Sequence, residues 1–229
     1  MSNFKRRVSV LIAALALFIV GVGLAPAAPV QAFTGSPVVF FTPHQDDEVL
    51  SMGAAIRQHV LAGRQVWVVL LTDGGASAEC LTQYTTRAAC VAERDKEFTA
   101  GVYSMGATPT IRSDRMADLT LTSDYVKRVV EEYYNYGTGY KNASFKTTGE
   151  YDAHPDHVAA GQGLRAAVGP TDKRFYVSPE NNWANHAGTF SPQYNLNTTL
   201  DLYPFGKISV PGYFASARYP QGCFSKVYA

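Results

Sequence analysis

The segment Val38-Val39-Phe40-Phe41-Thr42-Pro43-His44-Gln45-Asp46-Asp47-Glu48 joins an apolar run to a dense group of charged residues. The run from 38 to 42 is typical of a central parallel strand that is buried on both faces. One histidine and three acids then follow within five residues, at the carboxyl end of the predicted strand. A metal ion explains this density, because it turns carboxylates that repel each other into joint ligands.

A second cluster, His154-Pro155-Asp156-His157, supplies the ligands that the first one lacks. Zinc enzymes typically use three protein ligands and leave a fourth position for water. His44 and Asp47 are three residues apart near a strand-to-helix turn, so their side chains can converge, and His157 can provide the third ligand. Asp46 then remains outside the ligand set, where a carboxylate can take a proton from the activated water.

The other members of the second cluster have predicted roles in the reaction. His154 precedes His157 by about one helical turn, and it can donate a hydrogen bond or a proton on the opposite side of a reacting carbonyl. Asp156 can orient a histidine through its ring nitrogen, as carboxylates behind metal ligands do. We therefore expect a hydrolase of amides or esters that uses Zn²⁺, with another divalent first-row metal as the alternative cofactor.

Strands and helices alternate around the two clusters. This alternation predicts an α/β fold with an open, mostly parallel sheet, in which ligands bind beyond the carboxyl ends of the strands. The segment Asp73-Gly74-Gly75 is expected at the same edge as His44. The predicted strands are 38–42, 65–72, 108–112 and 174–178; the predicted helices are 48–62, 85–105, 123–134 with Ser123 as N-cap, and 155–168; residues 135–150 are predicted to be a loop.

Residues 1–32 have the composition of a signal peptide. Three basic residues at 5–7 precede an apolar stretch from 8 to 24, and Val30-Gln31-Ala32 is typical of a cleavage site, which places the mature start at Phe33. The alternative is an uncleaved membrane anchor. Cleavage predicts a secreted or extracytoplasmic protein without stable membrane insertion, in which residues 33–229 form a single α/β domain.

The charge of the chain gives no indication of a nucleic-acid partner. The full chain has 20 basic and 19 acidic residues, and removal of 1–32 takes away three basic ones, which leaves a net charge of −2. At this balance we expect no electrostatic attraction to nucleic acid or to anionic lipid.

The chain has three cysteines, and export to an oxidising compartment favours one disulfide among them. Cys80 and Cys90 are close in sequence and can join a loop to a helix, which leaves Cys223 free. The other two pairings stay open. A zinc site built from all three cysteines is a further alternative, although no C-x₂-C spacing supports it.

Residues 175–229 form an aromatic-rich C-terminal extension with many asparagines and prolines and no clear helical pattern. We expect short strands and ordered loops there. The aromatic residues form either a rim on which sugars stack or a packed extension that covers the edge of the sheet.

Four segments resemble motifs of the PIG-L/LmbE-like de-N-acetylases, which act on N-acetylglucosamine conjugates. Pro-His-Gln-Asp-Asp-Glu at 43–48 is similar to the Pro-His-Pro-Asp-Asp-Glu of that family, with Gln45 in place of a proline. Ala-His-Pro-Asp-His at 153–157 resembles the second family motif. Leu-Thr-Asp-Gly at 71–74 and Arg-Asp-Lys-Glu at 94–97, followed by Met105-Gly106, are similar to a loop and a helix of the family. The likeness extends from about 37 to 178.

The resemblance implies a Rossmann-like fold with helices on both faces of the sheet. It implies a zinc ion held by His44, Asp47 and His157, with Asp46 as general base. It also implies that His154 is the electrophilic or acid partner, with Asp156 behind it.

The reaction implied by the resemblance is removal of the acetyl group from an N-acetylated amino sugar or its conjugate, so the expected partner is a small-molecule or glycoconjugate substrate. The predicted substrate residues are Tyr151, Asp118 and Trp183. One alternative is a zinc amidase or esterase with a non-sugar substrate. The other is a metal-stabilised carbohydrate-binding protein without turnover, against which the presence of Asp46 argues, because binding needs no base beside the water.

Overall fold

Seven strands form one sheet in the order β3-β2-β1-β4-β5-β7-β6. The computed structural model describes residues 33–177, 191–195 and 224–228. Neighbours among the first five strands are parallel, whereas β7 runs antiparallel to β5 and to β6, so the sheet is mostly parallel as predicted. The strands are β1 (Val38–Thr42), β2 (Val66–Thr72), β3 (Thr108–Met116), β4 (Ser144–Thr148), β5 (Asp172–Val177), β6 (Ser191–Asn195) and β7 (Phe224–Tyr228).

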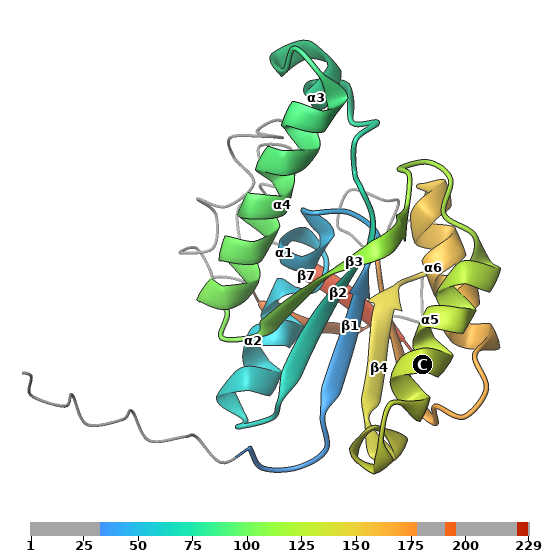
Figure 1. The fold of residues 1–229 in the computed structure, drawn as a ribbon. Coiled ribbons are helices and arrows are strands. Elements are labelled where there is room, and N and C mark those ends of the chain that lie inside the picture. Colours follow the sequence, from blue (N-terminus) through green and yellow to red (C-terminus); the bar gives the residue numbers. More distant parts are fainter. Residues whose placement is uncertain (1–32, 178–190, 196–223, 229) are drawn as a thin grey trace, which may run out of the picture. The chain divides into compact units, whose positions relative to one another are not determined.

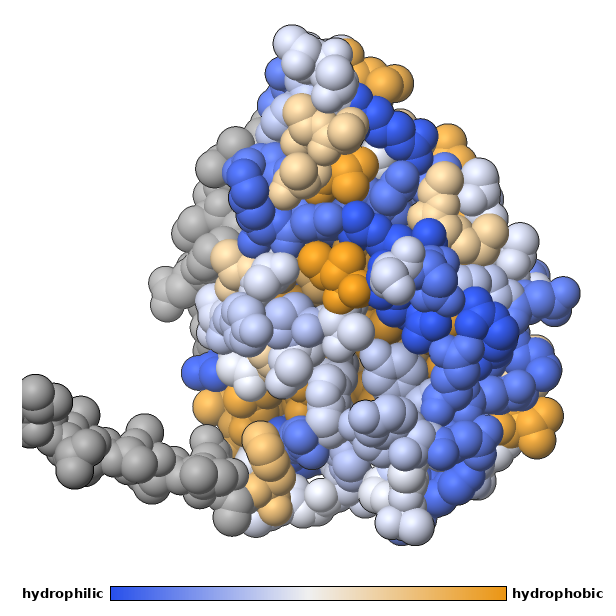
Figure 2. Space-filling view, viewed as in Figure 1, coloured by the Kyte–Doolittle hydropathy of each residue, from blue (hydrophilic) through white to orange (hydrophobic). Residues whose placement is uncertain are grey.

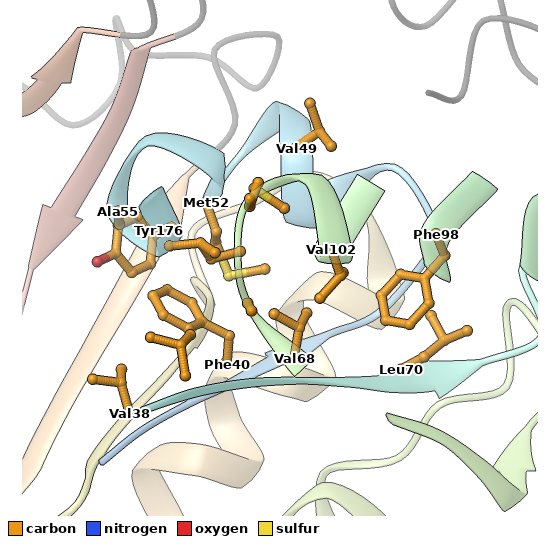
Figure 3. Close-up of a cluster of buried hydrophobic side chains, with 14 of the residues drawn as sticks. Val38, Phe40, Val49, Met52, Ala55, Val68, Leu70, Phe98, Val102 and Tyr176 are labelled. Carbon is orange, nitrogen blue, oxygen red and sulfur yellow. The ribbon is translucent and has the colours of Figure 1, made fainter. Parts of the chain in front are cut away.

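Helices cover both faces of the sheet, because alternate residues of the inner strands are apolar on both sides. Val38 and Phe40 of β1 belong to one buried cluster, which is shown in Figure 3, and Val39 and Phe41 belong to a second. Fully burying each of these side chains stabilises the fold by roughly 1.5–3 kcal/mol. The first cluster includes residues of α1 (Asp47–Leu50), α2 (Gly53–Leu61) and α4 (Arg87–Ser104); the second includes residues of α5 (Ser123–Asn135) and α6 (Pro155–Ala166) (Figure 1).

The carboxyl ends of β1 and β2 are tied together at the edge where the charged motifs lie. The hydroxyl of Thr72 donates a hydrogen bond to the carbonyl oxygen of Pro43 at 2.7 Å, and the backbone N–H of Thr72 contacts the same oxygen at 3.1 Å. The hydroxyl of Thr42 donates to the carbonyl of His44 at 2.9 Å. These bonds fix the turn in which the first cluster begins.

The prediction of a loop over 135–150 is wrong. The segment contains a short 3₁₀ helix, η1 (Thr138–Asn142), and then β4, which lies between β1 and β5 in the middle of the sheet. The sequence Ser-Phe-Lys-Thr-Thr of β4 is mostly polar, yet all five residues are buried. Hydrogen bonds make this burial possible: the hydroxyl of Thr147 donates to the carbonyl of Phe41 at 2.8 Å.

Other boundaries differ in smaller ways. The predicted helix 48–62 is two helices, α1 and α2, because the N–H of Met52 reaches back five residues to the carbonyl of Asp47 and interrupts the regular ladder. The N-cap of α5 is Thr122 instead of Ser123, since its hydroxyl accepts the N–H of Tyr125. The third strand extends to Met116, and α3 (Ala78–Gln83) precedes α4.

The C-terminal extension contributes β6 and β7, which continue the sheet beyond β5. Through these two strands the extension covers the edge of the sheet at β5. A packed extension over the sheet edge was one of the two alternatives expected from the sequence. The remaining parts of the extension, and the predicted signal peptide, lie outside the described residues. Within the part of the chain that the structure describes, no helix is long and apolar enough to span a membrane.

Cys80 and Cys90 form a disulfide, as predicted, with their Cα atoms 5.5 Å apart. The bond joins α3 to the first turn of α4, and both cysteines are buried. Cys223 lies outside the described residues.

Loss of this disulfide is expected to destabilise the protein. The bond closes a loop across a sequence separation of 10 residues, which corresponds to about 2–3 kcal/mol on the chain-entropy model. We expect the double variant Cys80→Ser/Cys90→Ser to show this loss in urea unfolding, and the parent to show a similar loss when dithiothreitol is present. Equal unfolding midpoints for parent and variant would contradict the prediction.

Candidate metal centre and active site

The residues of the first motif are positioned by the turn that leads from β1 into α1. Asp47 is the first residue of α1, and its Oδ2 atom accepts the backbone N–H of His44 at 3.0 Å. His157 approaches from the first turn of α6, whose first residue is Pro155. A proline at this position suits a helix start, because its fixed backbone angle is helical and its missing N–H would have no partner.

Three side-chain atoms converge at this point. The Nδ1 atom of His44 lies 3.1 Å from Oδ2 of Asp47, and Nε2 of His157 lies 3.1 Å from the same oxygen. The two ring nitrogens are 3.3 Å apart. The structure therefore brings together the three predicted metal ligands, and all three residues are buried.

This donor set fits a zinc ion. Zinc binds histidine nitrogen and carboxylate oxygen at about 2.0–2.2 Å in tetrahedral geometry, which separates neighbouring ligand atoms by roughly 3.3 Å. The three separations of 3.1–3.3 Å agree with this value. His44, Asp47 and His157 would hold the ion and leave a fourth position for water or substrate.

Each histidine of this set has a carboxylate at its other ring nitrogen. Oδ2 of Asp152 lies 2.9 Å from Nδ1 of His157, and Oδ2 of Asp156 lies 3.1 Å from Nε2 of His44. Such carboxylates fix the tautomer and orientation of metal-binding imidazoles. Asp156 is itself held by the backbone N–H groups of Leu119 and Leu121, at 2.8 and 3.1 Å.

The electrostatics of the site favour positive charge. Burial lowers the pKa of His157, but the charges of Asp47 and Asp152 outweigh it and raise that pKa to about 10. The pKa of His44 is likewise raised above its usual value, because hydrogen bonds to Asp118 and Asp156 outweigh burial. The same carboxylates that favour protons on these rings would stabilise a divalent cation between them.

The carboxylate of Asp46 has a partner outside the ligand set. One of its oxygens lies 3.2 Å from the guanidinium of Arg94, and both side chains are almost completely buried. Burial raises the pKa of Asp46, and the charge of Arg94 offsets only part of that rise. Arg94 also donates to the carbonyl of Gly74, so one side chain links the base to the loop after β2. Asp46 thus lies beside the three ligand side chains while its carboxylate is held by Arg94.

His154 lies beside the two histidines of the ligand set. Its ring is 4.6 Å from the ring of His44 and 4.9 Å from that of His157, measured between centroids. Its Nδ1 atom accepts the backbone N–H of Asp156 at 3.2 Å, which leaves the proton of the neutral ring on Nε2. Burial and then the charges of His44 and His157 lower the pKa of His154, so the neutral ring is favoured.

A cavity of about 430 Å³ opens onto these residues. His44, Asp46, Asp47, His154 and His157 all line it, together with Arg94 and the small side chains of Ala76, Ser77 and Ala153. This volume suits a small-molecule site.

The predicted substrate residues have different positions. Asp118 lines the cavity, but its Oδ1 atom also lies 3.1 Å from Nε2 of His44 and its Oδ2 accepts the N–H of Ala76 at 2.8 Å. It therefore supports a ligand as well as facing the cavity. Tyr151 is 46% exposed and does not line the cavity. Trp183 lies outside the described residues.

Three features of the site differ from what the sequence predicted. Asp156 was expected behind His154, but its carboxylate contacts His44 instead. Asp152 and the pairing of Arg94 with Asp46 were not predicted at all. Asp152 follows the exposed Tyr151 in a loop of polar residues, and no spacing rule connects Arg94 to a motif about fifty residues away. Only the arrangement of α4 against α1 and the loop after β2 brings them together.

The fold and the site define an α/β protein with a histidine–carboxylate metal centre at the carboxyl edge of its parallel strands. Residues 39–168 match the family model PIG-L, which is described as GlcNAc-PI de-N-acetylase. This match covers more than half of the chain and includes every predicted ligand, so the chain belongs to the PIG-L family. The comparison with curated proteins gave no match.

Solved structures with the same fold include proteins of different activity. The hydratase GalB from Pseudomonas putida has a TM-score of 0.55 at 17% identity, over 85% of this chain and 95% of GalB. A triple mutant of the deacetylase Orf2 from the teicoplanin biosynthetic pathway has a TM-score of 0.54 at 17% identity, over 84% and 98% of the two chains. The N,N'-diacetylchitobiose deacetylase from Pyrococcus horikoshii has a TM-score of 0.50 at 17% identity, over 78% and 70%. At these identities the likeness establishes the fold.

Proposed function

We propose that this protein is an exported, zinc-dependent deacetylase that removes the acetyl group from an N-acetylated amino sugar or its conjugate. A deacetylase of the PIG-L type is the class that the family match supports. The observation that carries the proposal is the convergence of His44, Asp47 and His157 within 3.1–3.3 Å, with a separate acid, Asp46, beside them. A site for binding alone needs no such additional acid.

The role of Asp46 follows from its surroundings. Zinc held by the three ligands would lower the pKa of a coordinated water towards neutrality and polarise a carbonyl oxygen. The carboxylate of Asp46 accepts the proton of the attacking water and later delivers it to the leaving nitrogen. Its contact with Arg94 keeps it oriented into the cavity and favours its ionised form.

His154 is suited to stabilise the negative charge that develops on the carbonyl oxygen. Because the backbone N–H of Asp156 occupies Nδ1, the neutral ring presents an N–H donor at Nε2. His154 is only half-buried and lines the cavity, so this donor is accessible to substrate. A preoriented donor of this kind typically contributes about 10²–10³-fold to the rate.

The proposal of an amino-sugar substrate rests on the family and on two solved structures of similar fold, a deacetylase of the teicoplanin biosynthetic pathway and an N,N'-diacetylchitobiose deacetylase. The proposal of export rests on the composition of residues 1–32 and on the buried disulfide, because disulfides persist in oxidising compartments. The proposal of zinc rests on the mixed nitrogen and oxygen ligands, which suit that ion without excluding other first-row metals.

The decisive assay measures amine release from N-acetylglucosamine, N,N'-diacetylchitobiose and a glycoconjugate by protein loaded with one equivalent of zinc. We expect release from at least one acetamido sugar and none after chelation, with activity restored by zinc. Hydrolysis of simple acetate esters or peptide-like amides without any release from the sugars would favour the alternative of a zinc amidase or esterase. Zinc binding and sugar binding without turnover of any substrate would favour a binding protein.

A further inference from the structure

A second cavity, of about 460 Å³, lies away from the metal centre. It is bordered by β2, by the edge strand β3, by the C-terminal part of α5 and by η1. The two cavities share no lining residue. Trp67 of the second cavity is six residues before Asp73 at the carboxyl end of β2, which corresponds to about 20 Å along an extended strand.

Four aromatic side chains form one continuous wall of this cavity. Tyr140 is at its centre, with ring centroids 5.2 Å from Trp67, 6.4 Å from Tyr133 and 5.8 Å from Tyr136. Trp67, Tyr133 and Tyr140 are partly buried, whereas Tyr136 is 82% exposed. The Tyr136 ring contacts Tyr140 at its edge, and its exposure leaves an aromatic face available to a ligand.

A charged pair borders the aromatic wall. The guanidinium of Arg112 lies 2.9 Å from a carboxylate oxygen of Glu132, and its Nε lies 2.8 Å from Asp114. The side chain of Arg112 is mostly buried, while that of Glu132 is 43% exposed. Because each charge has a partner of opposite sign, the cavity has no strong net charge. Its guanidinium and carboxylate groups are planar hydrogen-bond donors and acceptors.

These features together select a class of ligand. A quaternary ammonium ion needs rings arranged around it, whereas here the rings pack against each other, and the charge of Arg112 opposes a cation. A protein partner would need a broad apolar surface, but the lining of this cavity combines aromatic rings with Arg112 and Glu132. Figure 2 shows hydrophobic and hydrophilic residues interspersed on the face of the molecule in view. A pyranose ring has an apolar face that can stack on aromatic rings and hydroxyl pairs that match a guanidinium and a carboxylate.

We propose that this cavity is a second carbohydrate-binding site, which binds a neutral hexopyranose unit of a glycan separately from the catalytic centre. Trp67, Tyr136 and Tyr140 provide the stacking surface, and Arg112 and Glu132 bind hydroxyl groups. Because the two cavities share no lining residue and Trp67 lies near the amino end of β2, the second site is distinct from the catalytic one. The second site therefore holds the protein on an extended glycan and does not take part in the reaction.

The test uses cellopentaose, which lacks acetamido groups and cannot be deacetylated. The chain has only two tryptophans, so in a Trp183→Phe background Trp67 is the sole indole. We expect cellopentaose to change the emission of Trp67 in a saturable way. The additional change Tyr136→Ala should raise the Kd by about three- to tenfold, because it removes an exposed stacking face. Calorimetry on the unmodified full chain provides the same Kd if Trp183→Phe affects folding.

Tyr103→Ala is the matched control, since Tyr103 is also a largely exposed tyrosine, 63% exposed, but lies on α4 outside the cavity. It should leave the Kd unchanged, and neither tyrosine variant should alter kcat/KM for a small N-acetylated sugar. The proposal is overturned if cellopentaose gives neither a saturable change nor heat, or if Tyr136→Ala binds as tightly as Tyr103→Ala. Because this binding measurement needs no turnover, absence of cellopentaose binding would not contradict the proposed deacetylation. Likewise, absence of deacetylation would not contradict sugar binding at the second cavity.

Discussion

Replacement of Asp46 by asparagine is expected to lower kcat for deacetylation by about 10²–10⁴-fold while the protein still binds one zinc ion. Asparagine has nearly the same shape and still offers an oxygen to Arg94, which lies 3.2 Å from the carboxylate in the parent. It cannot accept the proton of the attacking water. The measurements are steady-state amine release from an acetamido sugar and metal analysis of the same preparation.

Asp47→Asn is the matched control, because it changes the neighbouring acid by the same single group. Asp47 contacts both histidines of the ligand set, so this variant should lose zinc affinity as well as activity. If Asp46→Asn lost the metal and Asp47→Asn kept it, the two roles would be exchanged. Thermal unfolding of both variants shows whether loss of a buried charge has also destabilised the fold, a cost that can reach several kcal/mol.

The sequence was sufficient for the parts of the fold that rest on continuous apolar patterns. Strands β1 and β2 are buried runs of Val, Phe and Leu, and their period and length indicated both their type and their parallel pairing. The charged motif after β1 then fixed the location of the site, since parallel strands place their carboxyl ends at one edge. For this reason the three predicted ligands could be selected before any distance was known.

Strand β4 could not be recognised in this way, because its composition is that of a loop. Lys146 is buried in the centre of the sheet, and burial lowers its pKa to about 8. Local pattern cannot predict that a lysine and two threonines will occupy a core strand, since their burial depends on partners far away in the sequence. The hydroxyl of Thr148, which bonds to the carbonyl of His157 at 3.3 Å, shows what the strand contributes to the site.

The residues that support the ligands were missed for a related reason. Asp152 was not predicted, and for Arg94 and Asp118 the contacts with Asp46 and His44 were not predicted, because these contacts join separate elements. Their burial is the only local sign of their role, and it exists only in the folded chain. The rule that a metal-binding histidine has an acceptor at its second nitrogen indicated Asp156, but it identified neither the partner of Asp156, which is His44, nor Asp152.

Metal binding provides the second large expected effect. His157→Ala should reduce zinc content to near zero at protein concentrations where the parent holds one equivalent, because one of three protein ligands is lost and Asp47 and Asp152 lose their shared partner. Asp152→Asn retains every ligand and alters only the acceptor at Nδ1 of His157, so we expect zinc affinity to fall by about 10–100-fold. Competition with a chromogenic chelator measures both values.

The comparison between these two variants distinguishes a metal centre from a buried ion-pair network. In a network without metal, Asp152→Asn would affect stability but no zinc affinity would exist to change. A ligand that binds only the folded state stabilises it by mass action. In a metal centre, added zinc should therefore raise the Tm of the parent strongly. It should raise the Tm of Asp152→Asn only at higher zinc concentrations, and that of His157→Ala very little. Asp124→Asn, an exposed acid of α5, should behave as the parent. Retention of full zinc affinity in His157→Ala would remove His157 from the ligand set, and His154, which also groups with His44, would then be the candidate for its place.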